Sequence, residues 1–272
     1  MLAQAAARLA AAGVPSPRVD AELLLAAVLG VPRSQLVLAD APDATARADF
    51  ETVLDRRLHR EPLQYIVGTA PFRHIELAVG PGVFIPRPET ELLVDAVLPG
   101  LRAVASPVVV DLCAGSGALA LSLADELPAA RVFAVEQAGS AIAWLERNAA
   151  GTGVEVVTAD VADPQLLGNL RGQVHAVVSN PPYVPRSVEV AAEVSFDPDS
   201  AVFAGADGLA VIPAVIARAA ELLRPGGMLA IEHDDTHAHA VPDLLRADGR
   251  WDQISDRSDL VGSPRFAVAN RR

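Results

Sequence analysis

The chain has 272 residues, of which 51% are hydrophobic and 21% are charged, and its formal net charge is −12. This length is enough to bury a substantial core, in one large domain or in a small and a medium one. The single cysteine, Cys113, allows no intramolecular disulfide and no cysteine zinc site, which is typical of a reducing compartment. We find no signal peptide and no apolar run of membrane-spanning length, so we expect a cytosolic protein with no membrane contact.

The charged residues exclude some functions. All 22 basic residues are arginine, so the chemistry of a lysine nucleophile or Schiff base is excluded. No basic stripe accompanies the acidic balance, although proteins that hold bare nucleic acid by its phosphates usually have one. A protein or small-molecule substrate therefore fits better than direct nucleic-acid binding.

Residues 1–60 are predicted to form a small helical domain. Leu23, Leu24, Ala27 and Val28 lie one turn apart, and Asp43 is placed to cap a helix that starts at Ala44. The pattern predicts a bundle of three or four helices without catalytic motifs. This domain has two equally good interpretations, a packing cap on the rest of the protein or a surface that recognises a partner.

Residues 61–82 are predicted to form a β-hairpin that links two domains. The runs 64–68 and 75–79 are rich in β-branched residues and are joined by Pro71-Phe72. A helix start follows at Pro88, and Arg87 stands between two prolines, where a surface salt bridge is its simplest interpretation.

From residue 83 to 272 the pattern predicts an α/β catalytic domain. Short apolar strands alternate with helical stretches, which indicates a parallel sheet with helices on both faces. Residues 251–255 and 265–269 are too close in sequence for a helical crossover, so they should pair as an antiparallel hairpin at the sheet edge. Strands are expected at 107–112, 131–136, 154–158, 175–179 and 228–232, and helices at 118–126, 140–149, 164–170 and 208–223.

The run Asn180-Pro181-Pro182-Tyr183 follows a predicted buried strand, and its two prolines end that strand. Open α/β sheets bind ligands at this end of their strands. The Asn180 side-chain carbonyl and the Pro181 backbone carbonyl can together accept both hydrogens of an –NH2 group, while Tyr183 offers a flat face to a planar substrate. From these four residues alone, a simple turn after a strand is an equally good interpretation.

A candidate cofactor loop runs from Asp111 to Gly117 between the first parallel strand and a helix. Gly115 permits a tight turn, and Gly117 would allow the backbone to approach a ligand. Glu136 ends the next strand, where a carboxylate can bind ribose hydroxyls, and Asp160 is placed for an adenine amino group. The glycine pattern fits a dinucleotide dehydrogenase almost as well, but the acidic Asp111 suits a cationic sulfonium better than a pyrophosphate. We therefore expect S-adenosylmethionine.

Together these runs resemble the N5-glutamine methyltransferases that modify peptide chain release factors. The resemblance covers almost the whole chain, and its most specific parts are Gln-Tyr-Ile-Val-Gly at 64–68 and Ile-Pro-Arg-Pro-Glu-Thr-Glu at 85–91, with Asp207-Gly208-Leu209 in addition. Asn-Pro-Pro-Tyr is shared with adenine-N6 DNA methyltransferases.

The resemblance implies a Rossmann-like S-adenosylmethionine-dependent methyltransferase sheet that ends in an antiparallel pair, with a helical N-terminal domain. The implied substrate is the glutamine of the Gly-Gly-Gln loop of a class I release factor. Residues 84–89 would lie along the cleft. The implied catalytic residues are Asn180, Pro181 and Tyr183, with Pro182 and Glu89 also at the substrate, and the cofactor residues are Phe84, Arg87, Asp111, Gly115, Gly117, Glu136, Asp160 and Asn180.

Two runs depart from the family pattern. Cys113-Ala114 stands where Gly-Thr is usual, and we interpret Cys113 as a small buried residue rather than a nucleophile. Glu232-His233-Asp234 stands where Glu-x-Gly is usual. His233, His237 and His239 are spaced like metal ligands, but without a companion cysteine we interpret them as a solvated helix start.

Two other functions compete with glutamine methylation. An adenine-N6 nucleic-acid methyltransferase would use the same four residues, but the charge of −12 disfavours it. A non-catalytic nucleotide-binding protein is disfavoured by the intact Asn-Pro-Pro-Tyr run. Neither the preferred release factor nor the oligomeric state follows from the sequence.

Overall fold

The computed structural model describes residues 1–272, which form two compact units. We call them the helical unit and the catalytic unit. The helical unit comprises Met1–Thr69, Val79–Pro81 and Val190–Asp197, and the catalytic unit comprises Ala70–Ala78, Gly82–Glu189 and Pro198–Arg272. The chain therefore returns to the helical unit for eight residues in the middle of the catalytic sequence.

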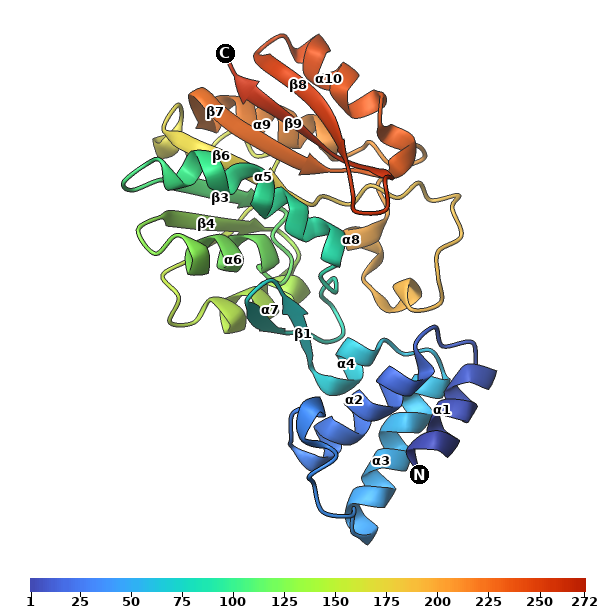
Figure 1. The fold of residues 1–272 in the computed structure, drawn as a ribbon. Coiled ribbons are helices and arrows are strands. Elements are labelled where there is room, and N and C mark those ends of the chain that lie inside the picture. The colour runs from blue at the N-terminus through green and yellow to red at the C-terminus, as the bar shows by residue number, and fades with distance from the viewer. The chain divides into compact units, whose positions relative to one another are not determined.

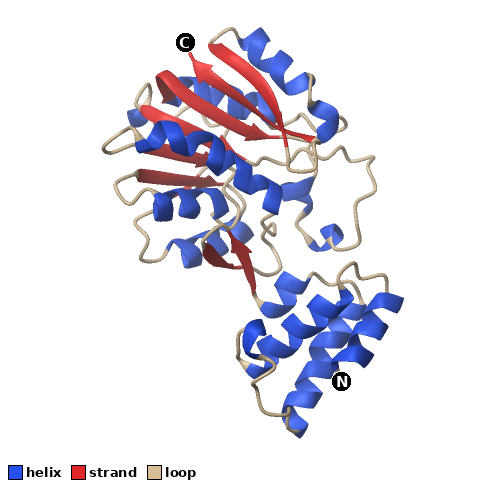
Figure 2. Ribbon diagram, viewed as in Figure 1, coloured by secondary structure: helices blue, strands red, loops and turns tan.

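The helical unit is a bundle around a small apolar core (Figure 2). Leu9, Leu24, Phe50 and Leu54 are fully buried at its centre. The predicted cap is confirmed, because Asp43 Oδ1 accepts a hydrogen bond of 2.8 Å from the Ala46 amide. The helices are α1 (Leu2–Ala11), α2 (Pro17–Leu29), α3 (Ala44–Leu58) and α4 (Leu63–Val67), with a 3-10 turn η1 (Arg33–Gln35).

The predicted strand at 64–68 is wrong, since these residues form helix α4 and its end. Pro62 precedes the helix with φ −55°, and Gly68 ends it in the left-handed conformation at φ 84°. These start and stop signals outweigh the β-branched residues between them. The hairpin lies further along the chain, as β1 (Thr69–Phe72) and β2 (Ile75–Ala78).

The segment Val190–Asp197 belongs to the helical unit through charged contacts. Glu193 accepts hydrogen bonds from Arg57 at 3.0 Å and from Arg60 at 2.6 Å, and the Tyr65 hydroxyl donates to Asp197 at 3.1 Å. A stretch that begins seven residues after Tyr183 is therefore held by helix α3 and the residues that follow it.

The catalytic unit contains a seven-stranded sheet with the order β5-β4-β3-β6-β7-β9-β8 (Figure 1). The first five strands in this order are parallel, and β9 enters antiparallel between β7 and β8. This confirms the predicted sheet with its terminal antiparallel hairpin. The strands are β3 (Val108–Leu112), β4 (Arg131–Glu136), β5 (Glu155–Thr158), β6 (Val174–Ser179), β7 (Leu223–Glu232), β8 (Trp251–Ser258) and β9 (Pro264–Arg271).

Helices cover both faces of this sheet. Helices α5 and α6 cross the near face in Figure 1, and α9 lies behind the sheet. Alternate strand residues such as Val110, Leu112 and Ile231 share one core with α9 and α10. The helices are α5 (Glu91–Arg102), α6 (Ala118–Glu126), α7 (Gly139–Ala149), α8 (Asp199–Val202), α9 (Ile212–Leu222) and α10 (Ala240–Asp248).

Two predicted helices are shorter than the sequence pattern indicated. The helix expected from 208 begins only at Ile212, because Gly208 adopts φ 77°, which no α-helix contains. The stretch 164–170 forms turns and the 3-10 turn η3 (Gly168–Leu170), since Leu167 lies at φ 48°. No helix combines the length and the apolar character needed to cross a bilayer.

Candidate active site

Sheet register gathers three chain segments at one edge. Ser179 pairs with Leu112 on one side and with Ile231 on the other, so Cys113, Asn180 and Glu232 each stand one residue beyond this row. Strand β3 has β4 on its other side, and the strand order therefore reverses between β3 and β6. Such a switch point is where open α/β sheets bind ligands.

The Asn180 side chain is held in one orientation. Its Nδ2 donates a 3.0 Å hydrogen bond to the Thr90 hydroxyl, which leaves Oδ1 available as an acceptor. Pro181 is buried, and its backbone carbonyl accepts no hydrogen bond from the chain. The geometry thus supplies two neighbouring acceptors for a ligand –NH2 group. The hydrogen bond to Thr90 orients the first of them, Asn180 Oδ1.

The Tyr183 hydroxyl donates a 2.8 Å hydrogen bond to Glu232 Oε1. Glu232 ends strand β7 and is only 1% exposed. Burial raises the pKa of Glu232 to about 7, although the hydroxyls of Thr90 and Tyr183 favour its ionised form. Burial also raises the pKa of Tyr183 well above its usual value, with the Glu232 charge as the second cause.

Gly208 explains why the Asp207-Gly208-Leu209 run accompanies the motif. A Cβ at Gly208 would lie 2.2 Å from the Tyr183 carbonyl oxygen and 2.8 Å from His237 Cε1. Only glycine permits this approach, which also requires φ 77°. His237 in turn bonds the Asp207 carbonyl through Nε2 at 2.8 Å. The segment therefore supports the backbone of Tyr183.

The interpretation of the histidines as solvated is wrong for two of the three. His233 is fully buried and His237 is 5% exposed, while His239 is exposed. His233 Nε2 lies 2.7 Å from Asp256 Oδ2, and its Nδ1 lies 2.8 Å from the Asp234 carbonyl. Pairing with these partners is what permits burial. No group of three or more histidine, cysteine or acidic side chains has a geometry that could hold a metal ion.

Asp111 lies beneath the candidate cofactor loop and is fully buried. Its Oδ2 accepts a 3.1 Å hydrogen bond from the Ala120 amide in the first turn of α6, whereas Oδ1 has no partner. Burial raises the pKa of Asp111 well above its usual value, and the Ala120 amide only partly opposes this. Asp111 thus binds the start of α6 and keeps one acceptor unsatisfied.

Glu136 closes the loop from the neighbouring strand. Its Oε2 accepts a 2.9 Å bond from the Gly115 amide, and its Oε1 accepts 2.8 Å bonds from Gln137 and Ala138. A carboxylate has about four acceptor positions, so about one remains, on Oε2. Glu136 therefore both holds the loop and keeps capacity for a ligand hydroxyl.

The two loop glycines have different roles. A Cβ at Gly115 would meet nothing within 4 Å, whereas one at Gly117 would lie 2.7 Å from Leu145 and 2.9 Å from Leu121. Gly117 precedes α6 with φ 90° and is needed for packing against these leucines. The loop therefore has open space for a ligand at Gly115 and not at Gly117.

Cys113 adopts φ 65°, a conformation that non-glycine residues rarely take. Glycine is the residue that adopts this conformation without a steric cost. Burial, followed by the charges of Glu136 and Asp111, raises the pKa of the thiol. A thiol with a raised pKa is a poor nucleophile at neutral pH, which disfavours a nucleophilic role. Cys113 is half-buried, however, rather than buried as the sequence suggested.

The other predicted site residues lie around these two clusters or make local contacts. The Arg87 guanidinium stacks on Phe84, with 4.9 Å between its central carbon and the ring centroid. Glu89 and Asp160 are exposed, and Asp160 Oδ1 accepts a bond from the Ala162 amide. The structure thus unites Asn180, Pro181 and Tyr183 in one cluster and Asp111, Gly115 and Glu136 in another. Sequence reasoning assigned no role to Thr90, Gly208 or Glu232, although all three lie in runs that it noted.

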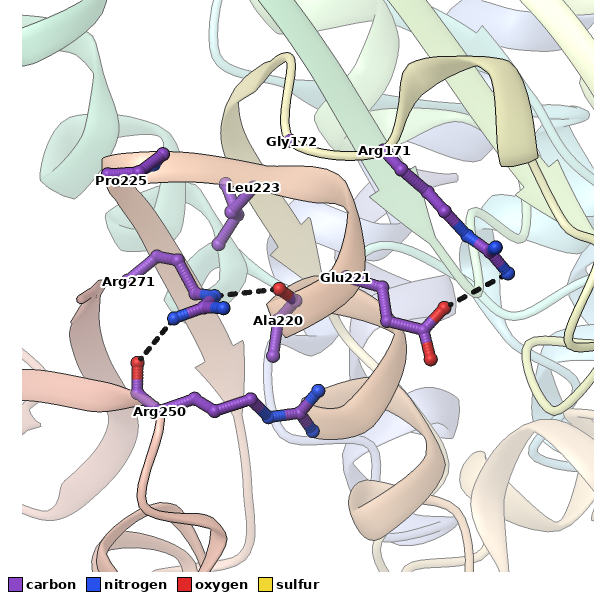
Figure 3. A pocket seen from close by; sticks show the side chains of 8 residues that line it. All are labelled: Arg171, Gly172, Ala220, Glu221, Leu223, Pro225, Arg250 and Arg271. Carbon is purple, nitrogen blue, oxygen red and sulfur yellow. Dashed lines mark hydrogen bonds and ion pairs between the residues drawn. The ribbon is translucent and has the colours of Figure 1, made fainter.

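A separate pocket of about 370 Å³ lies at the opposite edge of the sheet (Figure 3). Its arginines are engaged within the chain: Arg271 bonds the Ala220 carbonyl at 2.8 Å, Arg250 pairs with Asp248, and Arg171 pairs with Glu221. It lies where β6 and β8 begin and β9 ends, far from the carboxyl ends of the parallel strands. This pocket is therefore distinct from the candidate active site.

The fold and the switch-point site define the catalytic unit as a methyltransferase domain. Residues 76–195 match the family model of the methyltransferase small domain. Among solved structures, the hMettl16 catalytic domain in complex with MAT2A 3'UTR hairpin 6 has a TM-score of 0.56 at 15% identity. The match covers 72% of this chain and 75% of that one, and it shows a shared fold.

Similarity over the whole length identifies the family. The release factor glutamine methyltransferase of Mycolicibacterium smegmatis is 52% identical over 98% of this chain and 95% of its own length. The corresponding proteins of Streptomyces coelicolor and Mycobacterium tuberculosis are 47% and 45% identical, over 99% and 98% of this chain and 96% and 89% of their own lengths. Residues 1–68 match the PrmC N-terminal domain model. The chain belongs to the release factor glutamine methyltransferase family, which confirms the resemblance inferred from the sequence.

Proposed function

We propose that this protein transfers a methyl group from S-adenosylmethionine to the side-chain nitrogen of the glutamine in the Gly-Gly-Gln motif of class I peptide chain release factors. The observation that carries this proposal is the acceptor pair at the end of β6. Asn180 Oδ1 is available because the amide bonds Thr90 through Nδ2, and the Pro181 carbonyl is available because it accepts no hydrogen bond from the chain.

The acceptor pair matches the requirements of a primary amide. An amide nitrogen is a weak nucleophile because its lone pair is delocalised into the carbonyl. Two acceptors that take both N–H bonds orient the nitrogen toward an electrophile and stabilise the positive charge that develops on it. The alkylated nitrogen is acidic and loses its proton to water, so this scheme needs no ionisable base.

The second cluster fits the proposed cofactor, which supplies an electrophilic methyl group when bound. The unsatisfied Oδ1 of Asp111 is a buried acceptor suited to a cationic ligand. Glu136 keeps acceptor capacity for a ribose hydroxyl, and the side of Gly115 is open. We assign Asp111, Gly115 and Glu136 to cofactor binding, with Asp160 at the adenine and Phe84 and Arg87 beside the loop.

The proposed partner is a protein. The charge of −12 and the absence of a basic stripe disfavour direct nucleic-acid binding, and the related proteins are named for their action on release factors. We place Tyr183, Pro182 and Glu89 near the substrate glutamine. The proposed location is the cytoplasm, where release factors act.

Mass spectrometry of a purified release factor after incubation with the protein and S-adenosylmethionine tests the proposal. We expect a mass gain of one methylene group on the Gly-Gly-Gln peptide, and none when that glutamine is replaced by asparagine. Parallel reactions should contain DNA and RNA. Methylation of nucleic acid instead of the peptide would contradict the proposal and support an adenine-N6 methyltransferase.

A further inference from the structure

Glu232 is a buried carboxylate that the proposed transfer does not use directly. It is 1% exposed and comes from strand β7, whereas Asn180 and Tyr183 follow strand β6. Its Oε1 accepts the Tyr183 hydroxyl at 2.8 Å, and its Oε2 has no partner of good hydrogen-bond geometry. The Thr90 hydroxyl nevertheless interacts with this carboxylate and lowers its pKa. A carboxylate this deeply buried without a direct ion pair is costly, so a role beyond packing is indicated.

Thr90 connects this carboxylate to Asn180. The Thr90 hydroxyl accepts a hydrogen bond from Asn180 Nδ2 at 3.0 Å and stabilises the ionised form of Glu232. A hydroxyl has a single hydrogen to donate. If that hydrogen is directed to Glu232, Thr90 can only accept from Asn180, and the Asn180 amide must then present its oxygen to the substrate.

We propose that Glu232 is a positioning residue whose negative charge, acting through Thr90 and directly on Tyr183, sets the orientation of the Asn180 amide and of the Tyr183 ring for methyl transfer. An ionised carboxylate can only accept hydrogen bonds, so it determines which group donates and which accepts at each hydrogen bond of the network. A neutral group at this position can donate to Thr90, which frees the Thr90 hydrogen for Asn180 Oδ1. The amide would then turn its –NH2 toward the –NH2 of the substrate, and the acceptor pair would be lost.

The charged and titratable neighbours of Glu232 come from three elements. Arg265 at the start of β9 favours the ionised form, Glu89 in the 3-10 turn η2 (Pro88–Thr90) disfavours it, and the Tyr183 hydroxyl donates to it. Arg265 itself is paired with Asp259 at 3.1 Å. The pKa of about 7 that results from burial and these neighbours places the change of orientation within the working pH range.

The role of Glu232 rests on the proposed function, and kinetics of E232Q, T90V and T90S test it. We expect E232Q and T90V each to lower kcat by about 10- to 100-fold with unchanged affinity for S-adenosylmethionine, because only the substrate acceptor is misplaced. The double variant should be no slower than either single variant, since both act in one network. T90S keeps the hydroxyl and should retain the wild-type rate.

A pH profile separates positioning from packing. Wild-type kcat should fall as the pH decreases through about 7, where Glu232 takes up its proton, and E232Q should lack this decrease. Full activity of E232Q, an unchanged pH profile, or additive losses in the double variant would each overturn the role of Glu232. Loss of cofactor affinity in E232Q would show a merely structural role, which also overturns it.

A readout without turnover keeps this test separate from the proposed function. The side-chain amide signals of Asn180, followed by ¹⁵N NMR, should titrate in the wild type with the protonation of Glu232 and should not titrate in E232Q. Absence of transfer by the wild type would refute the proposed function alone. Identical Asn180 signals in both proteins at all pH values would refute the role of Glu232 alone.

Discussion

The ion-pair cluster around Arg57 in the helical unit contrasts with the buried carboxylates Asp111 and Glu232 in the catalytic unit. In the helical unit, Arg57 is 4% exposed and pairs with Asp20 at 2.8 Å and with Glu193 at 3.0 Å. Burial raises the pKa of Glu193, but its bonds to Arg60 and Arg57 outweigh this and bring the pKa to about 2. In the catalytic unit, burial dominates at Asp111 and Glu232, and both pKa values are raised.

We interpret this difference as one between carboxylates that stabilise the fold and carboxylates that are placed for a ligand or a hydrogen-bond network. A carboxylate that makes direct ion pairs keeps its charge and stabilises the fold, but only while both partners remain. A buried carboxylate with one unsatisfied oxygen costs stability and is retained where a ligand or a hydrogen-bond network needs it. Asp111 and Glu232 each have such an oxygen, and each adjoins one of the two clusters of the candidate active site.

The largest expected effect comes from breaking the paired cluster. Arg57→Ala leaves the charges of Asp20 and Glu193 without this partner, and we expect it to cost about 3–5 kcal/mol of stability. Urea unfolding measures the cost, and hydrogen exchange should show it in the helical unit. The matched control is Arg272→Ala, whose exposed pair with Asp252 should contribute less than about 1 kcal/mol. Equal losses in both variants would contradict the distinction between the units.

In the catalytic unit, removal of the substrate acceptor should affect rate rather than stability. We expect Asn180→Ala to lower kcat by about 10²–10³-fold, because one of two groups that stabilise the developing charge is lost. Its affinity for S-adenosylmethionine, measured by calorimetry, should remain within about twofold. Glu136→Ala should show the reverse, a large loss of cofactor affinity. If Asn180→Ala lost the cofactor instead, the assignment of the two clusters would be wrong.

The raised pKa of Glu232 predicts a pH dependence of stability. The folded protein binds this proton more tightly than the unfolded chain, so stability should fall as the pH rises from about 4 to about 7 and should not change further because of this group. The loss from this carboxyl is roughly 3 kcal/mol. E232Q should lack this contribution, and the difference between the two pH–stability curves measures it. Parallel curves would refute the raised pKa.

Gly208→Ala tests the support of Tyr183. The added Cβ meets a backbone carbonyl at 2.2 Å and also occupies a left-handed conformation, so we expect a loss of about 2–3 kcal/mol together with reduced transfer. Gly226→Ala is the control, since it has φ 76° but nothing within 4 Å. It should cost only about 1 kcal/mol and leave transfer unchanged. Similar effects of the two variants would mean that Gly208 matters only for its φ.

The smallest expected effect is a gain in stability. Cys113→Gly removes the strain of a side chain at φ 65°, and after the entropy cost of glycine we expect about 0.5–1 kcal/mol of stabilisation. Cys113→Ala keeps a Cβ and should not show this gain. Thermal unfolding of the two variants distinguishes relief of backbone strain from removal of the thiol.

Sequence patterns predicted most of the catalytic fold, because parallel strands buried on both faces appear as continuous apolar runs. They failed where local signals compete. Residues 64–68 were expected to form a strand, but they form a helix that Pro62 precedes and Gly68 ends. Gly208 likewise delays the start of the helix that follows it. His233 and His237 appeared solvated, because their partners Asp256 and Asp207 come from distant segments.

By itself, the sequence determined the family and the sheet with its antiparallel end, and it predicted a set of candidate site residues, because strand periodicity, proline, glycine and short motifs act locally along the chain. Only the tertiary structure decided which carboxylates are paired and which are left unsatisfied. It placed Thr90 between Asn180 and Glu232, and Gly208 against Tyr183. These relations join residues that are 25 to 142 positions apart, and burial and hydrogen bonding at that separation are set by sheet register and packing rather than by any local pattern.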